Sequence, residues 1–163
     1  MAAFRLGASH GWRAYECDVK LSADGVPFLL HDAELERTSN GSGRAGDLTW
    51  DALSRLDAGG WHSRSYAGEP LPTLAAVAAF VRANGHALNI EIKPTPGLER
   101  ETGAAVAREA ERLWAGDRFA PLLSSFRPDA LMSAREAAPA LPRALLVDTL
   151  WDGWLDAARA LEA

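Results

Sequence analysis

Two carboxylates stand on the same face of a strand-sized apolar run near the start of the chain. The run is Tyr15–Leu21, and because alternate side chains of an extended strand share a face, Glu16 and Asp18 point the same way while Cys17 points the opposite way. Two neighbouring carboxylates are costly to bury without a cation or a proton between them. A divalent metal ion held by carboxylate oxygens is one solution, and a partly solvated acidic strand end is the alternative.

A second strand-sized run repeats this pattern. In the segment 88–93, Glu91 and Lys93 share one face and two isoleucines share the other. His31 follows another short apolar run. Three acids, a histidine and a lysine at the ends of apolar strands predict a metal-assisted phosphate site. The plainer alternatives are a structural role for His31 and an ion pair between Lys93 and either Glu91 or Glu16.

Composition limits the classes of protein to consider. The chain has 163 residues, of which 48% are hydrophobic, which is enough for one domain with a core and argues against disorder. The net charge of -5 and the lack of a basic tract argue against nucleic acid or a membrane surface as a partner. Cys17 is the only cysteine, which fits a reducing compartment, and no apolar run reaches the roughly 18 residues of a membrane span. We therefore expect a cytoplasmic protein without stable membrane insertion.

Helices and strands are predicted to alternate along the chain. A turn at Ser22–Gly25 separates the strand 15–21 from a short strand 26–30, and a long polar stretch, about 32–68, contains a short helix 48–53 with Thr49 as its cap. Thr73 is the predicted N-cap of the next helix. The remaining predicted elements are helices 2–11, 73–84, 98–114, 128–137 and 154–163, and strands 88–92, 121–126 and 143–148.

This alternation predicts an α/β protein with a parallel sheet, either doubly wound or a barrel. No glycine-rich phosphate loop joins a strand to a helix, because Gly41-Ser42-Gly43 lies in the long polar stretch. Charged residues at the C-terminal ends of several strands favour the barrel.

Six short motifs then occur in a characteristic order. They are Tyr15–Gly25, Leu30–Asp32, Leu35–Gly41, Gly68–Leu74, Asn89–Pro94 and Leu122–Phe126. Together they resemble the glycerophosphodiester phosphodiesterase family, in particular its bacterial cytosolic branch. The resemblance implies a TIM (β/α)8 barrel with a small insertion after strand 2, here about residues 32–68. The family begins with a strand ending in His-Arg-Gly, followed by Pro-Glu-Asn-Thr, and neither motif is present. We therefore expect residues 1–163 to form a partial barrel that lacks the first strand and the last strands.

The resemblance also implies roles for individual residues. Glu16, Asp18 and Glu91 match metal ligands, and oxygen ligands suit Mg²⁺ or Ca²⁺. His31 matches a catalytic histidine that would protonate the leaving alkoxide. Lys93 matches a residue near the phosphate. The implied reaction is metal-dependent hydrolysis of small-molecule glycerophosphodiesters to glycerol 3-phosphate and an alcohol.

The main alternative is a non-catalytic, truncated remnant of such an enzyme. We expect the chain alone to have little or no activity, and its open sheet edges make a homo-oligomer one possible outcome. A sugar-phosphate barrel enzyme of another family would need a phosphate loop in its later strands, and the chain contains none. We assign Cys17 to the core as an inert thiol and treat His10, His62 and His86 as structural. Trp61 is expected to pack within the insertion or, alternatively, to wall the substrate cleft, and the other five tryptophans are assigned to packing.

Overall fold

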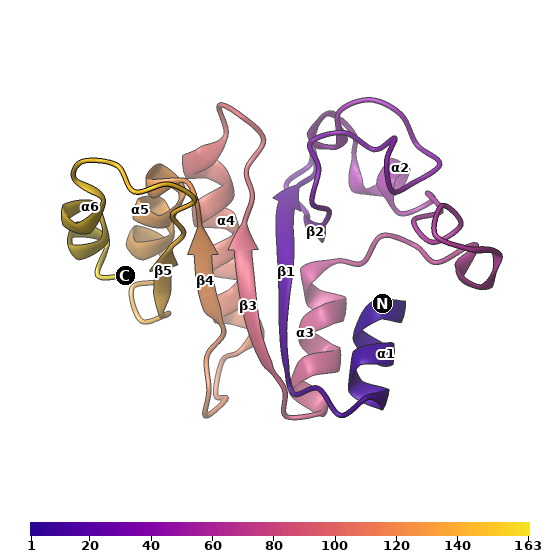
Figure 1. The fold of residues 1–163 in the computed structure, drawn as a ribbon, viewed down its shortest axis with the longest axis horizontal. Helices are drawn as coiled ribbons and strands as arrows, with labels where there is room; N and C mark the ends of the chain where they lie inside the picture. Colours follow the sequence, from indigo (N-terminus) through magenta and orange to yellow (C-terminus); the bar gives the residue numbers. More distant parts are fainter.

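A five-stranded sheet in the order β2-β1-β3-β4-β5 organises the chain (Figure 1). The computed structural model describes residues 1–163. Neighbouring strands of the series β1, β3, β4 and β5 are parallel, and β2 pairs with β1 in the antiparallel sense. The strands are β1 (Ala14–Leu21), β2 (Pro27–Leu29), β3 (Ala87–Ile92), β4 (Leu122–Ser125) and β5 (Arg143–Leu145).

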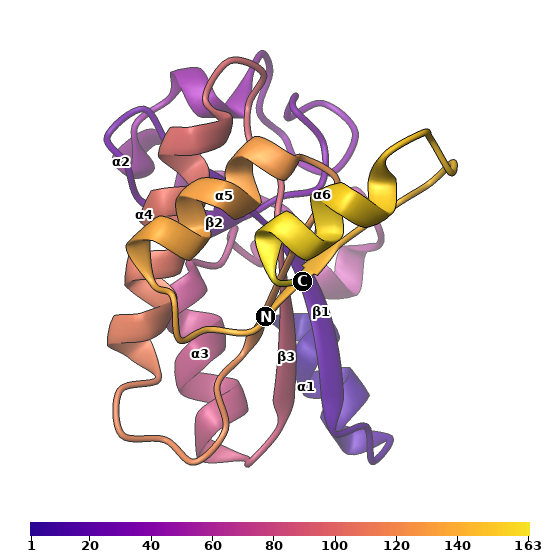
Figure 2. The same cartoon turned by 90° about the vertical axis from the view of Figure 1, so that its left-hand side faces the viewer.

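Helices alternate with the parallel strands, as the sequence predicts. Figure 2 shows α3, α4 and α5 gathered on one side of the sheet. Their apolar side chains, those of the strands and a few from α1, α6 and the loops form a core of 22 buried residues, which includes Val19, Ile90 and Leu123. The helices are α1 (Ala2–Ser9), α2 (Trp50–Leu53), α3 (Leu74–Ala83), α4 (Glu99–Leu113), α5 (Pro128–Ala137) and α6 (Trp154–Leu161).

The two predicted threonine caps differ in the structure. Thr73 Oγ1 accepts a hydrogen bond from the Ala76 amide at 3.1 Å, so it caps α3 as predicted. Thr49 occupies the N-cap position of α2, but its side chain makes no capping hydrogen bond. Asp24 Oδ1 instead accepts from the Trp50 amide at 2.8 Å. The turn after β1 therefore supplies the cap of a helix that lies 26 residues further along.

The acids of β1 lie before the part of the strand that pairs with β2. Val19 to Leu21 pair with Leu29 to Pro27 of β2, so β1 continues beyond the part that it shares with β3. Glu16 and Asp18 consequently lie in the first half and the middle of β1, and not at its C-terminal end as the sequence predicts. They still lie at the level of Glu91, because Asp18 and Glu91 are partners in the parallel register.

The segment 32–68 is largely irregular and lies beyond the C-terminal end of β1 (Figure 1). It carries α2 and two short 3-10 turns, Ala45–Asp47 and Arg64–Tyr66. A second apolar cluster anchors it to β2: Phe28, Leu30, Leu35, Ala45, Leu53 and Leu71 are all buried there. The polar stretch is thus held in place by a few buried side chains.

The four parallel strands with their helices form an open sheet of the kind found in a TIM barrel. Strand β5 is shorter than the predicted 143–148, because its partner β4 ends at Ser125 and the last ladder bond runs from Leu146 N to Ser125 O.

The assignment of five tryptophans to packing is wrong in part. Trp114 is buried, but the side chains of Trp12 and Trp151 are exposed. No helix is long and apolar enough to span a membrane.

Candidate metal and catalytic site

Three carboxylates converge on the face of the sheet opposite the helices. Asp18 and Glu91 are register partners on β1 and β3, and Glu16 precedes Asp18 by two residues on the same face. One carboxylate oxygen from each residue lies within 4.8 Å of the other two. The strand alternation seen in the sequence therefore brings these three side chains together.

Lys93 lies beside two of these acids. Its Nζ donates to Asp18 Oδ1 at 3.0 Å and lies 3.5 Å from Glu91 Oε1. The sequence predicts an ion pair with Glu91 or Glu16 as the alternative to phosphate binding, and the observed partners are Asp18 and Glu91. The lysine offsets part of the repulsion between the carboxylates.

Lys20 is a second cation on this face that the sequence interpretation missed. Its side chain is buried, and its Nζ donates to the Lys93 carbonyl oxygen at 3.1 Å. Burial, and then the nearby charge of Lys93, lower the pKa of Lys20. The signal was present in the chain, because Lys20 continues the alternation of Glu16 and Asp18 and is one of only two lysines.

The surroundings of Glu16 raise the pKa of its side chain. Burial raises the pKa of Glu16, and the negative charges of Asp18 and Glu91 raise it further. Lys93 and His31 act in the opposite direction. A carboxylate with a raised pKa next to two other acids is the electrostatic environment that a bound cation relieves.

The donor set fits a divalent ion. Ca²⁺ takes oxygen ligands at about 2.3–2.6 Å, so two oxygens on opposite sides of one ion lie about 5 Å apart at most. The three carboxylates, whose oxygens lie within 4.8 Å of one another, are close enough for one ion to draw them together. Mg²⁺, which requires about 2.0–2.1 Å, would draw them closer than Ca²⁺ would.

Two further polar side chains on this face have no hydrogen-bond partner. Asn89 Oδ1 and Ser124 Oγ are both buried and unpaired. In the sheet register Asn89 is the partner of Glu16, and Ser124 is the partner of Glu91. The alternation along β3 that places Glu91 on this face also places Asn89 there. The burial of Ser124 depends on packing that the sequence does not reveal.

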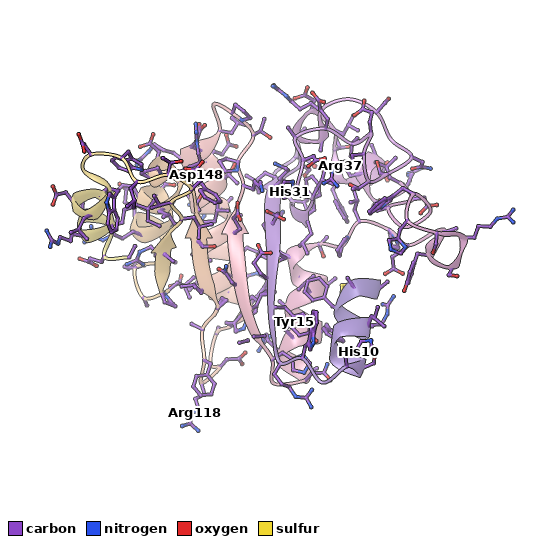
Figure 3. The ribbon with its side chains drawn as sticks, in the orientation of Figure 1. His10, Tyr15, His31, Arg37, Arg118 and Asp148 are labelled. Carbon is purple, nitrogen blue, oxygen red and sulfur yellow. The ribbon has the colours of Figure 1, made fainter.

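His31 lies just after β2, and its side chain is exposed. Its Nδ1 lies 2.7 Å from Asp32 Oδ1. Hydrogen bonds from Arg37 and His31 hold the pKa of Asp32 well below its usual range. Figure 3 shows His31 at the tip of β1 with Arg37 beside it, whereas Tyr15 and His10 lie at the opposite end of the strand.

A cavity of about 500 Å³ connects His31 with the acids. Glu16, Asp18 and His31 all line it, together with residues of α1 and of the segment 58–72. Trp61 also lines this cavity and is 54% exposed, so its position favours the cleft wall over packing in the insertion. Glu91 and Lys93 line a separate cavity of about 230 Å³, to which Arg127 contributes.

Cys17, His86 and His62, which were all assigned structural roles, lie in different surroundings. Cys17 is buried in the core on the helix side of β1, and burial raises the pKa of its thiol, so the expected inert thiol is observed. His86 is buried against the rings of Tyr15 and Phe80 and has a structural role, as expected. His62 lines the larger cavity, which the sequence interpretation did not anticipate.

Comparisons with known proteins agree with this geometry. The model of the glycerophosphoryl diester phosphodiesterase family matches residues 1–160. A putative glycerophosphodiester phosphodiesterase of Bacillus subtilis is 33% identical over 150 residues, which are 90% of this chain and 58% of that protein. A glycerophosphodiester phosphodiesterase of Caldanaerobacter subterraneus is also 33% identical, over 152 residues, with 90% of this chain and 59% of that protein covered.

Solved structures show the same relationship. An Oleispira antarctica phosphodiesterase in complex with the product sn-glycerol-3-phosphate superposes with a TM-score of 0.92 at 35% identity, and the match covers 99% of this chain and 65% of that one. A glycerophosphodiester phosphodiesterase from Agrobacterium tumefaciens gives a TM-score of 0.76 at 32% identity, with coverage of 87% and 58%. The chain thus spans about three fifths of the length of the relatives that it matches.

Proposed function

Because the chain belongs to the glycerophosphoryl diester phosphodiesterase family, we propose that it carries the metal site and one catalytic histidine of an enzyme that hydrolyses glycerophosphodiesters to glycerol 3-phosphate and an alcohol. The similar Oleispira antarctica enzyme was solved with sn-glycerol-3-phosphate as its product, which supports this substrate class. We propose that residues 1–163 belong to one catalytic domain with an insertion at about 32–68. The single cysteine fits the cytoplasmic location that we propose for it.

The observation that carries the proposal is the meeting of Glu16, Asp18 and Glu91 within 4.8 Å. We propose that these three carboxylates hold a divalent cation, either Mg²⁺ or Ca²⁺. When bound, the cation would polarise a phosphoryl oxygen and reduce the repulsion between the phosphodiester and an incoming nucleophile.

Charge balance supports a monoanionic substrate. Three carboxylates are offset by one divalent cation and by Lys93, and Lys20 lies next to Lys93. With Lys20 protonated, the site carries one net positive charge, which matches the single negative charge of a phosphodiester. Lys93 would place its ammonium group near the charge that develops on the phosphoryl oxygens.

His31 is the proposed general acid. Its imidazole lies in the same cavity as Glu16 and Asp18, and an imidazole titrates near neutral pH, as proton transfer to a leaving alkoxide requires. The ring is exposed, so a substrate can reach it. Since the three carboxylates meet and two of them, Glu16 and Asp18, share a cavity with His31, the arrangement favours an enzyme over a non-catalytic remnant.

The test is a coupled assay for the release of glycerol 3-phosphate from glycerophosphoethanolamine, run on this chain and on a version extended at both ends, and every effect on activity refers to the version with measurable turnover. We expect hydrolysis to require a divalent cation and to be abolished by Glu91→Gln. Glu111→Gln, at an exposed position of α4, is the matched control and should leave the rate unchanged. Hydrolysis that persists in a chelator, or in the Glu91→Gln variant, would rule out the proposed metal site.

A further inference from the structure

His31, Asp32 and Arg37 form a continuous chain of hydrogen bonds at the end of β2. Asp32 Oδ1 lies 2.7 Å from His31 Nδ1 and also accepts a hydrogen bond from Arg37 Nη2 at 3.0 Å, while Arg37 Nε donates to Asp32 Oδ2. We propose that Arg37 is a positioning residue, which holds Asp32 and thereby fixes the orientation and tautomer of His31. This inference rests on the proposed role of His31 as general acid.

The arrangement determines which ring nitrogen is available for chemistry. The guanidinium of Arg37 binds both carboxylate oxygens of Asp32, a geometry that favours the ionised acid. An ionised carboxylate can only accept a hydrogen bond, so the proton shared with His31 lies on Nδ1. Nε2 is then the nitrogen that exchanges a proton with a substrate in the cavity.

The loop that carries Arg37 is anchored by its own buried residue. Leu35 has no exposed surface and belongs to the apolar cluster beneath the segment 32–68. Its amide donates to the Gly43 carbonyl oxygen at 3.1 Å, and its carbonyl oxygen accepts from Ser39 Oγ at 2.7 Å. Arg37 therefore extends from a fixed backbone towards Asp32.

An ordinary surface ion pair is the competing explanation for the Arg37–Asp32 contact. The Arg37 side chain is 59% exposed, and exposed ion pairs contribute little to stability. The two explanations differ in what Arg37 affects. A surface pair would leave the His31 ring unchanged when it is lost, whereas a positioning residue would not. Two other charged groups are coupled to this region, namely Glu16, whose pKa His31 lowers, and Lys20, whose pKa the charge of Asp32 raises.

The experiment observes the ring directly by long-range ¹H–¹⁵N correlation spectra of the ¹⁵N-histidine-labelled chain. The signals of His31 are identified by their loss in His31→Gln. We expect the Nδ1–H tautomer in the wild-type protein at a pH where His31 is neutral, a mixture of both tautomers in Arg37→Ala, and an intermediate pattern in Arg37→Lys. Arg55→Ala is the matched control, because Arg55 also binds both oxygens of an aspartate, Asp51, in the same insertion. It should reproduce the wild-type spectrum.

Activity supplies a second readout. Arg37→Ala should lower kcat by about 10- to 100-fold, the usual effect of losing a residue that orients a functional group, with KM unchanged. A wild-type His31 spectrum in Arg37→Ala would overturn the positioning role. If Arg37→Ala does not fold, Arg37→Gln takes its place under the same criterion. A spectral change, together with no release of glycerol 3-phosphate even by the version extended at both ends, would instead refute the proposed function and leave the positioning role standing.

Discussion

Asp18 and Glu91 are direct partners in the parallel register of β1 and β3, so their carboxylates project side by side from the same face of the sheet. Neighbouring like charges on adjacent strands are destabilising. The chain compensates with Lys93, whose Nζ lies 3.0 Å from Asp18 and 3.5 Å from Glu91. Lys93 and the neighbouring Lys20 together carry two positive charges against three acids, so a divalent cation among the carboxylates would supply the missing positive charge.

Divalent cations should therefore stabilise the folded protein. Addition of Ca²⁺ at about 100 times its Kd should raise the free energy of unfolding by about 2.7 kcal/mol, because only the folded state assembles the three ligands. Asp18→Asn and Glu91→Gln should each remove most of this effect. Thermal unfolding with and without Ca²⁺ measures it, and a Ca²⁺-dependent shift in Glu91→Gln as large as that of the wild type would contradict the assignment.

Replacing Glu16 should stabilise the metal-free protein, and the effect should depend on pH. Since the pKa of Glu16 is raised in the folded state, its ionisation opposes folding, and the native protein loses stability as the pH rises through that pKa. At pH 7, Glu16→Gln should therefore be more stable than the wild type. Below about pH 4, where the acid is protonated in both states, the difference should vanish.

Urea unfolding in a chelator at pH 4 and pH 7 tests this prediction. Glu111→Gln is again the control, because Glu111 is exposed and makes no ion pair. Equal stabilisation by Glu16→Gln at the two pH values would show that repulsion among the carboxylates is not its cause.

His31 should matter for turnover more than for folding. Because its side chain is exposed, His31→Ala should leave the unfolding temperature close to that of the wild type. The rate of glycerol 3-phosphate release should fall by about 10² to 10⁴, the usual contribution of a general acid. His10→Ala, at an exposed histidine just after α1, is the control. A change confined to KM would make His31 a binding residue.

Local patterns explain how much of this site the sequence could predict. Alternation along two strands was enough to place Glu16, Asp18 and Glu91 on common faces, and parallel pairing then brought the strands together. The threonine cap of α3 and the turn at Asp24-Gly25 are equally local signals. These features depend on a few neighbouring residues, and tertiary packing does not override them.

The features that were missed depend on contacts between distant segments. Asp24 caps α2 in place of Thr49 because the turn after β1 happens to meet that helix. The exposure of Trp12 and Trp151 and the buried hydroxyl of Ser124 likewise depend on what packs above them. The link from Arg37 to His31 needed the loop conformation that Leu35 anchors. None of these has a signal within its own stretch of sequence.

Gly103 sets the distance between α4 and α5, and replacing it should destabilise the protein. A Cβ atom at this position would lie 2.0 Å from the Ala130 carbonyl oxygen and 2.4 Å from Ser133 Oγ. In an exposed helix, Gly→Ala would gain about 1 kcal/mol of helix propensity. Here the helices must move apart, and overpacking of a filled core costs about 1–3 kcal/mol or more.

We therefore expect Gly103→Ala to lower the free energy of unfolding, although the higher helix propensity of alanine alone would raise it. Ala104 lies one residue further along the same helix and is only partly buried. Ala104→Gly therefore measures the difference in helix propensity between alanine and glycine, and it should lower the free energy of unfolding by about 1 kcal/mol. Guanidinium unfolding of the two variants separates the effects. If Gly103→Ala were more stable than the wild type, α4 and α5 would not be in the close contact that leaves no room for a Cβ atom at this position.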